Sequence, residues 1–282
     1  MFTALLVEFK FLTELSANNN ENNKTELTLI NQPSSHIDTQ QLLATGFKLF
    51  KTGFREIWTI LLTQTLSLLV LFVVLFGITI SFFGGSSITT LPTEFVVSLF
   101  ASILIILLVQ LGFIASFTTK FWAIAHGHHS TSSHAYGIGI KKALPLLIWL
   151  LLYVLIIWTG LFLLFVPGII LGTTLFMGAA LIIQDHHSVP HAFRASHKMV
   201  WPYLRVTLFY LLVSAGITLG LYFITLYPLG LFLTYLTTNL PMLHGILDIA
   251  RYALIVMLVP LFVALIIPFY MELLKRNPVQ TS

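Results

Sequence analysis

The sequence contains a long apolar run, from Ala143 to Ile183, that holds no Asp, Glu, Lys, Arg or His. A membrane-spanning helix needs about 20 apolar residues, so this run is too long for one span and long enough for two. Pro167 stands in the second half of the run and cannot donate within a helix, and Gly168 after it allows the backbone to reverse. We therefore predict two spans joined by a structural turn at Pro167 and Gly168.

Four other apolar runs are each long enough for one span, and the composition agrees with a membrane protein. The chain is 57% hydrophobic and 9% charged, whereas soluble globular domains are about 25% charged. We predict an all-α fold with cytosolic interfacial amphipathic helices and six transmembrane helices, at about residues 58–83, 95–117, 144–165, 167–184, 203–227 and 249–271. These spans form a domain at residues 37–276, between a disordered or weakly ordered cytosolic tail at 1–36 and a short tail at 277–282.

The basic residues support the same number of spans, because Lys and Arg accumulate in cytoplasmic loops. With six spans and an internal N-terminus, every Lys and Arg except Arg251 falls on the cytosolic side. If the Pro-Gly were not a turn, the basic residues of the later loops would fall on the opposite side. We therefore expect both termini in the cytosol, and residues 84–94, Pro167 and residues 234–248 outside.

Two stretches next to the spans have the periodicity of amphipathic helices. Apolar residues expected to share a side are Leu43, Phe47, Phe50, Phe54 and Ile57 in the first stretch, and Phe193, Val200 and Leu204 with His197 in the second. Basic residues expected on other sides are Lys48, Lys51, Arg55, Arg194, Lys198 and Arg205. The two stretches are either ordinary juxtamembrane helices or binding sites for anionic lipid headgroups.

Histidine is concentrated in two segments on the expected cytosolic side. The candidate metal ligands there are His126, His128, His129, His186, His187 and His191. Their spacing matches no specific metal motif, and Pro190 is expected to keep His187 and His191 off a common helix face. Three interpretations stay open: metal binding, protonation at about pH 6 with sensitivity to lipid or pH, and solvated loop histidines. We expect no cofactor.

Two glutamines are expected to lie at nearly the same depth in the hairpin of the first two spans. Gln64 follows the inner end of the first span, and Gln110 precedes the inner end of the second. A buried amide in hydrocarbon is costly unless it is paired. We therefore expect the two amides to face the interior and either to bond each other or to share a hydrated pocket.

Glycines in the later spans suggest a close helix contact. Gly216 and Gly220 have the Gly-xxx-Gly spacing that lets two membrane helices approach, with Gly172 and Gly178 as the expected neighbours. The alternative is that glycine is merely frequent in membrane helices.

The region around the Pro-Gly resembles the YciC family of bacterial inner-membrane proteins. The shared positions are Val166, Pro167, Gly168, Ile169, Ile170, Gln184, Asp185, Ala192, Ser196, Trp201 and Arg205. The stretch FKTGFREIWTILL before the first span is also similar, so the resemblance covers roughly residues 45–272. It implies a polytopic protein of the bacterial inner membrane, of a family whose activity is not established.

The residues themselves argue against several classes of function. The sequence has no phosphate-binding loop, nucleophile elbow or nucleic-acid signal, so we expect no enzyme. The spans have no ionisable residues away from their ends, which argues against an ion-coupled carrier. Two hypotheses remain: a non-catalytic protein with a structural, envelope-maintenance or scaffolding role, or a transporter or channel for a small or lipidic solute. Membrane lipids are the expected partners.

Overall fold

The computed structural model describes residues 37–83, 93–128, 130–184, 187–239 and 244–277, and the structural statements below refer to these residues. The tail at 1–36 and nearly all of the tail at 277–282 therefore lie outside the described residues.

Every regular element in the described part of the chain is helical. The helices are α2 (Thr39–Phe83), α3 (Thr93–Ala125), α4 (Ser132–Leu163), α5 (Phe165–Leu175), α6 (Gly178–Gln184), α7 (Val189–Val200), the short 3-10 helix η2 (Trp201–Tyr203), α8 (Leu204–Asn239) and α9 (His244–Arg276). Six helical stretches are long and apolar enough to cross a membrane: Thr39–Leu71, Thr93–Ala125, Ser132–Leu163, Phe165–Gln184, Val189–Ile224 and Leu258–Arg276. The predicted all-α fold with six membrane helices is confirmed.

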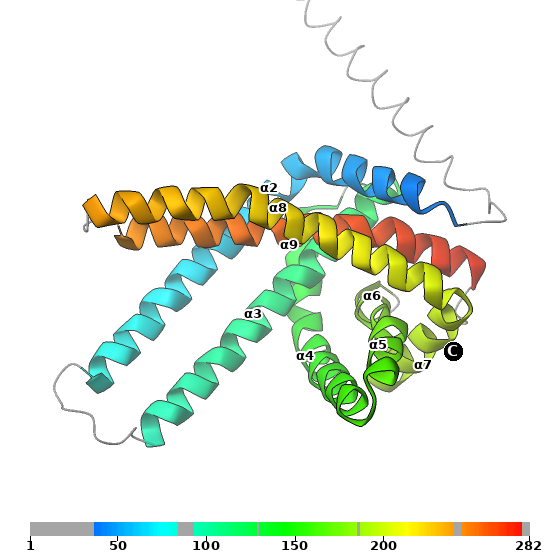
Figure 1. Ribbon diagram of the computed structural model, residues 1–282, viewed down its shortest axis with the longest axis horizontal. Helices are drawn as coiled ribbons and strands as arrows, with labels where there is room; N and C mark the ends of the chain where they lie inside the picture. Colours follow the sequence, from blue (N-terminus) through cyan, green and yellow to red (C-terminus); the bar gives the residue numbers. More distant parts are fainter. Residues whose placement is uncertain (1–36, 84–92, 129, 185–186, 240–243, 278–282) are drawn as a thin grey trace, which may run out of the picture.

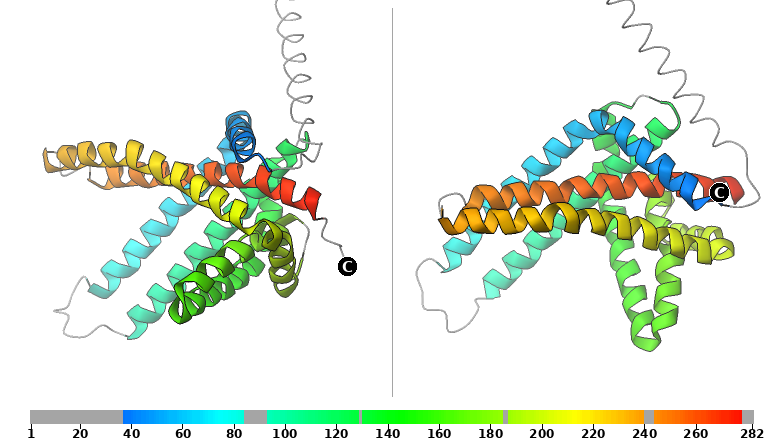
Figure 2. Two further views of the ribbon diagram at one scale, coloured as in Figure 1. Left: turned by 45° about the vertical axis from the view of Figure 1, so that its right-hand side comes forward. Right: turned by 45° about the horizontal axis from the view of Figure 1, so that its top comes forward.

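The helices are arranged as two hairpins and a crossing pair. Helices α8 and α9 lie side by side and run across the molecule, while the α2–α3 and α4–α5 hairpins extend from them toward the same side (Figures 1 and 2). Helix α2 bends, so that its first part lies near α9 and its second part runs beside α3. Helix α9 contacts α2, α3 and α8, which places it at the junction of the fold.

The turn inside the long apolar run is earlier than predicted. Helix α4 ends at Leu163, Leu164 has an extended backbone (φ −159°, ψ 130°), and α5 begins at Phe165. Pro167 lies in the first turn of α5, where a missing backbone N–H costs no helical hydrogen bond. Gly168 does not reverse the chain but packs closely against α4, where a Cβ would lie 2.6 Å from Leu161 Cγ.

Three other boundaries differ from the prediction. Pro228 lies inside α8, which continues to Asn239, because proline is tolerated in apolar membrane helices. Since α9 already begins at His244, most of the loop predicted at 234–248 is helical. The predicted span 167–184 is divided into α5 and α6, which meet at Phe176 and Met177.

The buried side of the first part of α2 is displaced from the predicted stripe by about one residue, or about 100° around the helix. The fully buried residues there are Leu42, Gly46, Leu49, Gly53, Ile57 and Ile60, whereas Phe47 is 40% exposed. The reason is close packing at glycine: a Cβ on Gly46 would lie 2.8 Å from Leu265 Cα of α9. A count of apolar side chains does not register glycine as a contact residue, so the prediction missed Gly46 and Gly53. Of the predicted stripe, Ile57 is fully buried, Phe47 is exposed, and the others, Leu43, Phe50 and Phe54, are partly buried against the core.

The buried side of α7 was predicted only in part, since Val200 is buried and Phe193 packs against the core, but His197 is exposed. The buried residues of this helix are Ala192, Ala195, Ser196, Met199 and Val200. His197, expected to share the buried side, is exposed and lies against Trp201 with a ring-centroid distance of 5.0 Å. Ser196 is buried because its hydroxyl donates to the Thr174 carbonyl oxygen, which ties α7 to α5.

Candidate functional site

Gln64 and Gln110 meet in the interior between α2 and α3. Gln64 is completely buried, and its Nε2 donates to Gln110 Oε1 at 2.7 Å. Of the two arrangements expected from their equal depths, this is the direct bond. Gln64 Oε1 has no hydrogen-bond partner among the described residues.

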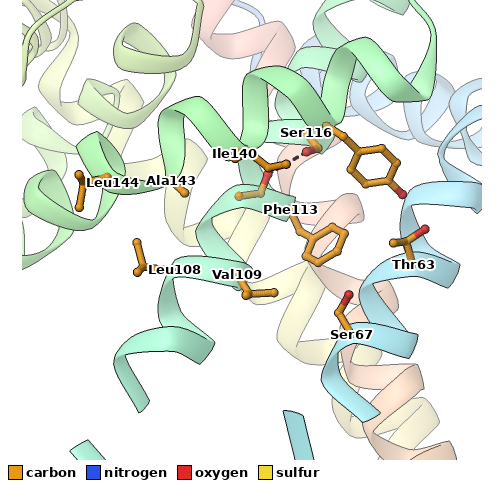
Figure 3. Close-up of a pocket in the computed structure, with 11 residues that line it drawn as sticks. Thr63, Ser67, Leu108, Val109, Phe113, Ser116, Ile140, Ala143 and Leu144 are labelled. Carbon is orange, nitrogen blue, oxygen red and sulfur yellow. Dashed lines mark hydrogen bonds between the residues drawn. The ribbon is translucent and has the colours of Figure 1, made fainter. Parts of the chain in front are cut away.

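A groove of about 700 Å³ lies beside this amide pair, between α2, α3 and α4 (Figure 3). Its lining residues come from all three helices: Thr63, Ser67, Leu108, Val109, Gly112, Phe113, Ser116, Tyr136, Ile140, Ala143 and Leu144. In Figure 3 the hydroxyl-bearing side chains of Thr63, Ser67 and Ser116 lie toward one end, and Leu108 and Leu144 lie toward the other. The volume is within the range of about 300–1,000 Å³ that is typical of small-molecule sites.

Three of the four hydroxyl groups that line the groove, those of Thr63, Ser116 and Tyr136, donate to backbone carbonyl oxygens. Ser116 donates to Gly112 at 2.8 Å, and Tyr136 donates to Thr59 at 3.1 Å. Thr63 likewise donates to the Thr59 carbonyl at 2.8 Å. These three groups therefore keep only acceptor capacity, and the groove offers little to a solute that needs many hydrogen bonds.

A cluster of polar groups, which we call the polar collar, joins α2, α3 and α4 beyond this end of the groove. It consists of Glu56, Thr59, Lys120, Ser132 and Tyr136. Lys120 Nζ lies 3.0 Å from Glu56 Oε2 and also donates to the Ser130 carbonyl oxygen, while the Thr59 and Ser132 hydroxyls are 2.9 Å apart. Lys120 is 4% exposed although it is charged. A buried charge requires such partners, since its desolvation is otherwise very unfavourable.

Sequence reasoning did not find the ion pair of the polar collar, although a signal was present. In the hairpin of the first two spans, residues at equal depth have numbers that add up to the same sum as Gln64 and Gln110, which places residue 118 opposite Glu56, two positions from Lys120. A Lys between Thr119 and Phe121 with an acid near the mirrored position indicates a buried pair. Lys120 was instead counted among the basic residues of the cytosolic side.

The six basic residues expected at lipid headgroups lie on three helices. Lys51 and Arg55 on α2, Arg194 and Lys198 on α7, and Arg205 on α8 are exposed, and Lys48 on α2 is partly buried. Their exposure leaves five of these cationic groups accessible to lipid headgroups or to solvent.

The histidine candidates do not form a ligand set in the described part of the chain. His126 and His128 are exposed, while His129 and His186 lie outside the described residues. His187 precedes α7, which begins at Val189, so it shares no helix face with His191, as expected; the two rings nevertheless lie close together, with centroids 4.3 Å apart. Ser188 caps α7 in an extended conformation, so the preceding His187 can fold back onto the first turn. No group of three or more His, Asp, Glu or Cys residues that could hold a metal occurs among the described residues.

The predicted glycine contact between spans four and five is wrong. A Cβ on Gly216 or Gly220 would meet no atom within 4 Å. The glycines of the fourth span contact α4 instead: a Cβ on Gly178 would lie 2.5 Å from Trp149 Nε1, and one on Gly172 would lie 3.4 Å from Ile157 Cδ1. Chain connectivity explains this, because α4 is the hairpin partner of α5 and packs against both α5 and α6.

The apolar helices, the intramembrane amide pair and the groove together define a polytopic integral membrane protein. Over 84 residues the chain is 30% identical to a UPF0259 membrane protein of Pectobacterium carotovorum subsp. carotovorum. The match covers 30% of this chain and 34% of the relative, so the chain spans about a third of that protein's length. No family model matches the sequence. No solved structure matches it either. The similarity supports a relation to a family of bacterial membrane proteins.

Proposed function

We propose that the chain is a non-catalytic protein of the bacterial inner membrane with a structural, envelope-maintenance or scaffolding role. The observation that supports this most directly is the bond between Gln64 and Gln110. A solute path between the first two membrane helices would need hydrated polar groups at this depth. Here the two amides bond each other, and Gln64 is completely buried. Basic residues that remain exposed on α2, α7 and α8 support anionic lipids as partners.

Solute flux through reconstituted protein tests this role. We expect vesicles that contain the protein to release small ions and neutral solutes no faster than protein-free vesicles, because the two amides between α2 and α3 bond each other. The matched control is the double variant Gln64→Leu with Gln110→Leu, which preserves bulk and removes the polar atoms. The structural role would be contradicted if vesicles with the unmodified protein showed flux above the protein-free level and the double variant abolished it. That result would mean that Gln64 and Gln110 take part in conduction.

The second candidate function is the movement of a lipidic solute, and the groove favours it. Its walls are mainly apolar, and Leu144 at its edge is 59% exposed. Such a groove suits an apolar chain from the bilayer better than a hydrophilic solute. Lipid scrambling by the reconstituted protein, at a rate above that of protein-free vesicles, would favour this candidate over a purely structural role.

The proposed topology places both termini in the cytosol. Single cysteines test it without background, because the chain has no Cys. We expect a Cys at Ser86, which lies outside the described residues, to react with an impermeant maleimide only from the outer side. A Cys at Ser133, exposed at the start of α4, should react only from the cytosolic side. The reverse pattern would overturn the orientation, and reaction of both from one side would overturn the number of spans between them.

A further inference from the structure

We propose that the groove between α2, α3 and α4 binds one acyl chain of an anionic glycerophospholipid, with the Lys141 ammonium at the lipid phosphate. This site is separate from the six basic residues considered above. It goes beyond the structural role, and it does not depend on the orientation of the protein in the membrane.

The position of the groove favours an acyl chain as its occupant. Ile140 and Leu144 at its edge are 77% and 59% exposed, so the groove opens onto the surface of helices that are apolar enough to span a membrane. In a bilayer the molecules next to such a surface are lipid tails. An open apolar hollow there gains dispersion contacts when a tail fills it, and an empty one forfeits them.

The chemistry of the lining also disfavours a hydrophilic ligand. The hydroxyl protons of Thr63, Ser116 and Tyr136 are all donated to backbone carbonyl oxygens. A sugar or an amino acid would lose its hydration in this groove and would find few donors in return. An acyl chain loses no hydrogen bonds on entry, so the groove selects for it.

Lys141 supplies the preference for an anionic headgroup. Ile140, Ala143 and Leu144 line the groove, and around α4 Lys141 lies about 60° from Leu144, about 100° from Ile140 and about 160° from Ala143, next to the exposed edge at Leu144. Side chains on a helix lean toward its N-terminus, so the exposed Lys141 extends toward the end of the groove where Tyr136 and Ser116 lie. The long aliphatic stem can follow the apolar wall while the ammonium reaches the polar end. A phosphate held there leaves the acyl chain directed toward Leu108 and Leu144.

Lys142 provides a matched control on the same helix. It lies about 160° from both Ile140 and Leu144, the exposed residues at the edge of the groove, and about 100° from Ala143. Lys141→Gln and Lys142→Gln therefore remove the same charge at nearly the same depth, at positions about 100° apart around one helix.

Photo-cross-linking in vesicles tests the proposal with the full chain. The probe is phosphatidylglycerol with a photoreactive group in one acyl chain, diluted into phosphatidylcholine, and the labelled peptides are identified by mass spectrometry. We expect label to concentrate on the parts of α2, α3 and α4 that line the groove. Label spread evenly over all lipid-facing helices would overturn the site.

Variants then separate the acyl site from the charge preference. Ala143→Trp fills the groove and should lower the label on these peptides about tenfold, whereas Ala101→Trp, on an exposed part of α3 outside the groove, should leave it unchanged. Lys141→Gln should reduce the preference for the phosphatidylglycerol probe over a phosphatidylcholine probe about fivefold, and Lys142→Gln should not. Equal effects of the two Lys variants would overturn the role of Lys141. If Ala143→Trp does not fold, the peptide map of the unmodified chain and the two Lys variants still decide the proposal.

Discussion

Replacement of Gly139 by alanine is expected to lower the free energy of unfolding by about 1–3 kcal/mol, the usual cost of overpacking a well-packed site. Gly139 on α4 is buried at the crossing with α3, and a Cβ there would overlap both Ser116 Oγ and the Gly112 carbonyl oxygen. The Ser116 hydroxyl can rotate, but the carbonyl belongs to the backbone of α3. The two helices must therefore move apart, and the groove between them must change shape.

Two other glycines give matched controls for this substitution. A Cβ on Gly112, at the same crossing, would lie 3.5 Å from the Gly139 carbonyl oxygen, which is an ordinary contact. A Cβ on Gly216 would meet nothing within 4 Å. Both Gly→Ala changes should be neutral or stabilising by up to about 1 kcal/mol, because alanine is the better helix former.

The measurement is the midpoint of thermal unfolding in detergent, followed by circular dichroism for the three variants and the unmodified protein. We expect a lower midpoint for Gly139→Ala and an unchanged or higher midpoint for Gly112→Ala and Gly216→Ala. A midpoint for Gly139→Ala equal to that of Gly112→Ala would show that the helices do not approach this closely. A lower midpoint for Gly216→Ala would indicate that the helix contact expected from the Gly-xxx-Gly spacing does exist.

The architecture could be predicted from the sequence because the hydropathy and charge patterns that define membrane helices extend over whole helices. The division of the apolar run into two helices needed only its length and the known thickness of a bilayer. The exact turn could not be predicted, because Pro167 is compatible both with a turn and with the first turn of a helix. The chain reverses at Leu164, an apolar residue with no turn signal of its own.

Contacts between helices were predicted well only where a specific polar group required a partner. Gln64 and Gln110 could be paired because a buried amide needs a hydrogen bond and a hairpin relates depths by reflection. Glycine contacts were not predictable in the same way, because glycine carries no group that requires a partner. Gly46, Gly139 and Gly168 form close contacts, whereas Gly216 and Gly220 do not, and the sequence around them does not distinguish the two sets.

The groove could not be derived from the sequence. Its lining residues lie at Thr63 and Ser67, at 108–116 and at 136–144, and only the angles between three helices bring them around one space. The three helices that line the groove, α2, α3 and α4, are joined at the polar collar. There the Tyr136 hydroxyl donates to the Thr59 carbonyl oxygen, and Lys120 pairs with Glu56. The collar therefore fixes how the ends of α2, α3 and α4 meet, and its stability bears directly on the groove.

Removal of the acid in the polar collar is expected to destabilise the protein strongly. Glu56→Gln removes the negative charge beside the Lys120 ammonium, which is 4% exposed, and leaves it neutral acceptors such as the amide oxygen at position 56 and the Ser130 carbonyl oxygen. Breaking a buried ion pair by removing one charge costs about 3–5 kcal/mol, because the other charge is left buried without compensation. Lys120→Met should cost less, because the side chain of Glu56 is 34% exposed and can be hydrated when its partner is absent.

The double variant Glu56→Gln with Lys120→Met distinguishes the pair from two independent effects. Replacing a buried ion pair by groups of similar volume is often neutral or stabilising, so the double variant should regain most of the stability that Glu56→Gln loses. Thermal unfolding of the four proteins forms a double-mutant cycle, and we expect a coupling of about 0.5–3 kcal/mol. Additive losses would mean that Lys120 and Glu56 do not stabilise each other. In that case the collar would hold α2, α3 and α4 through its hydroxyl contacts, Thr59 with Ser132 and Tyr136 with the Thr59 carbonyl.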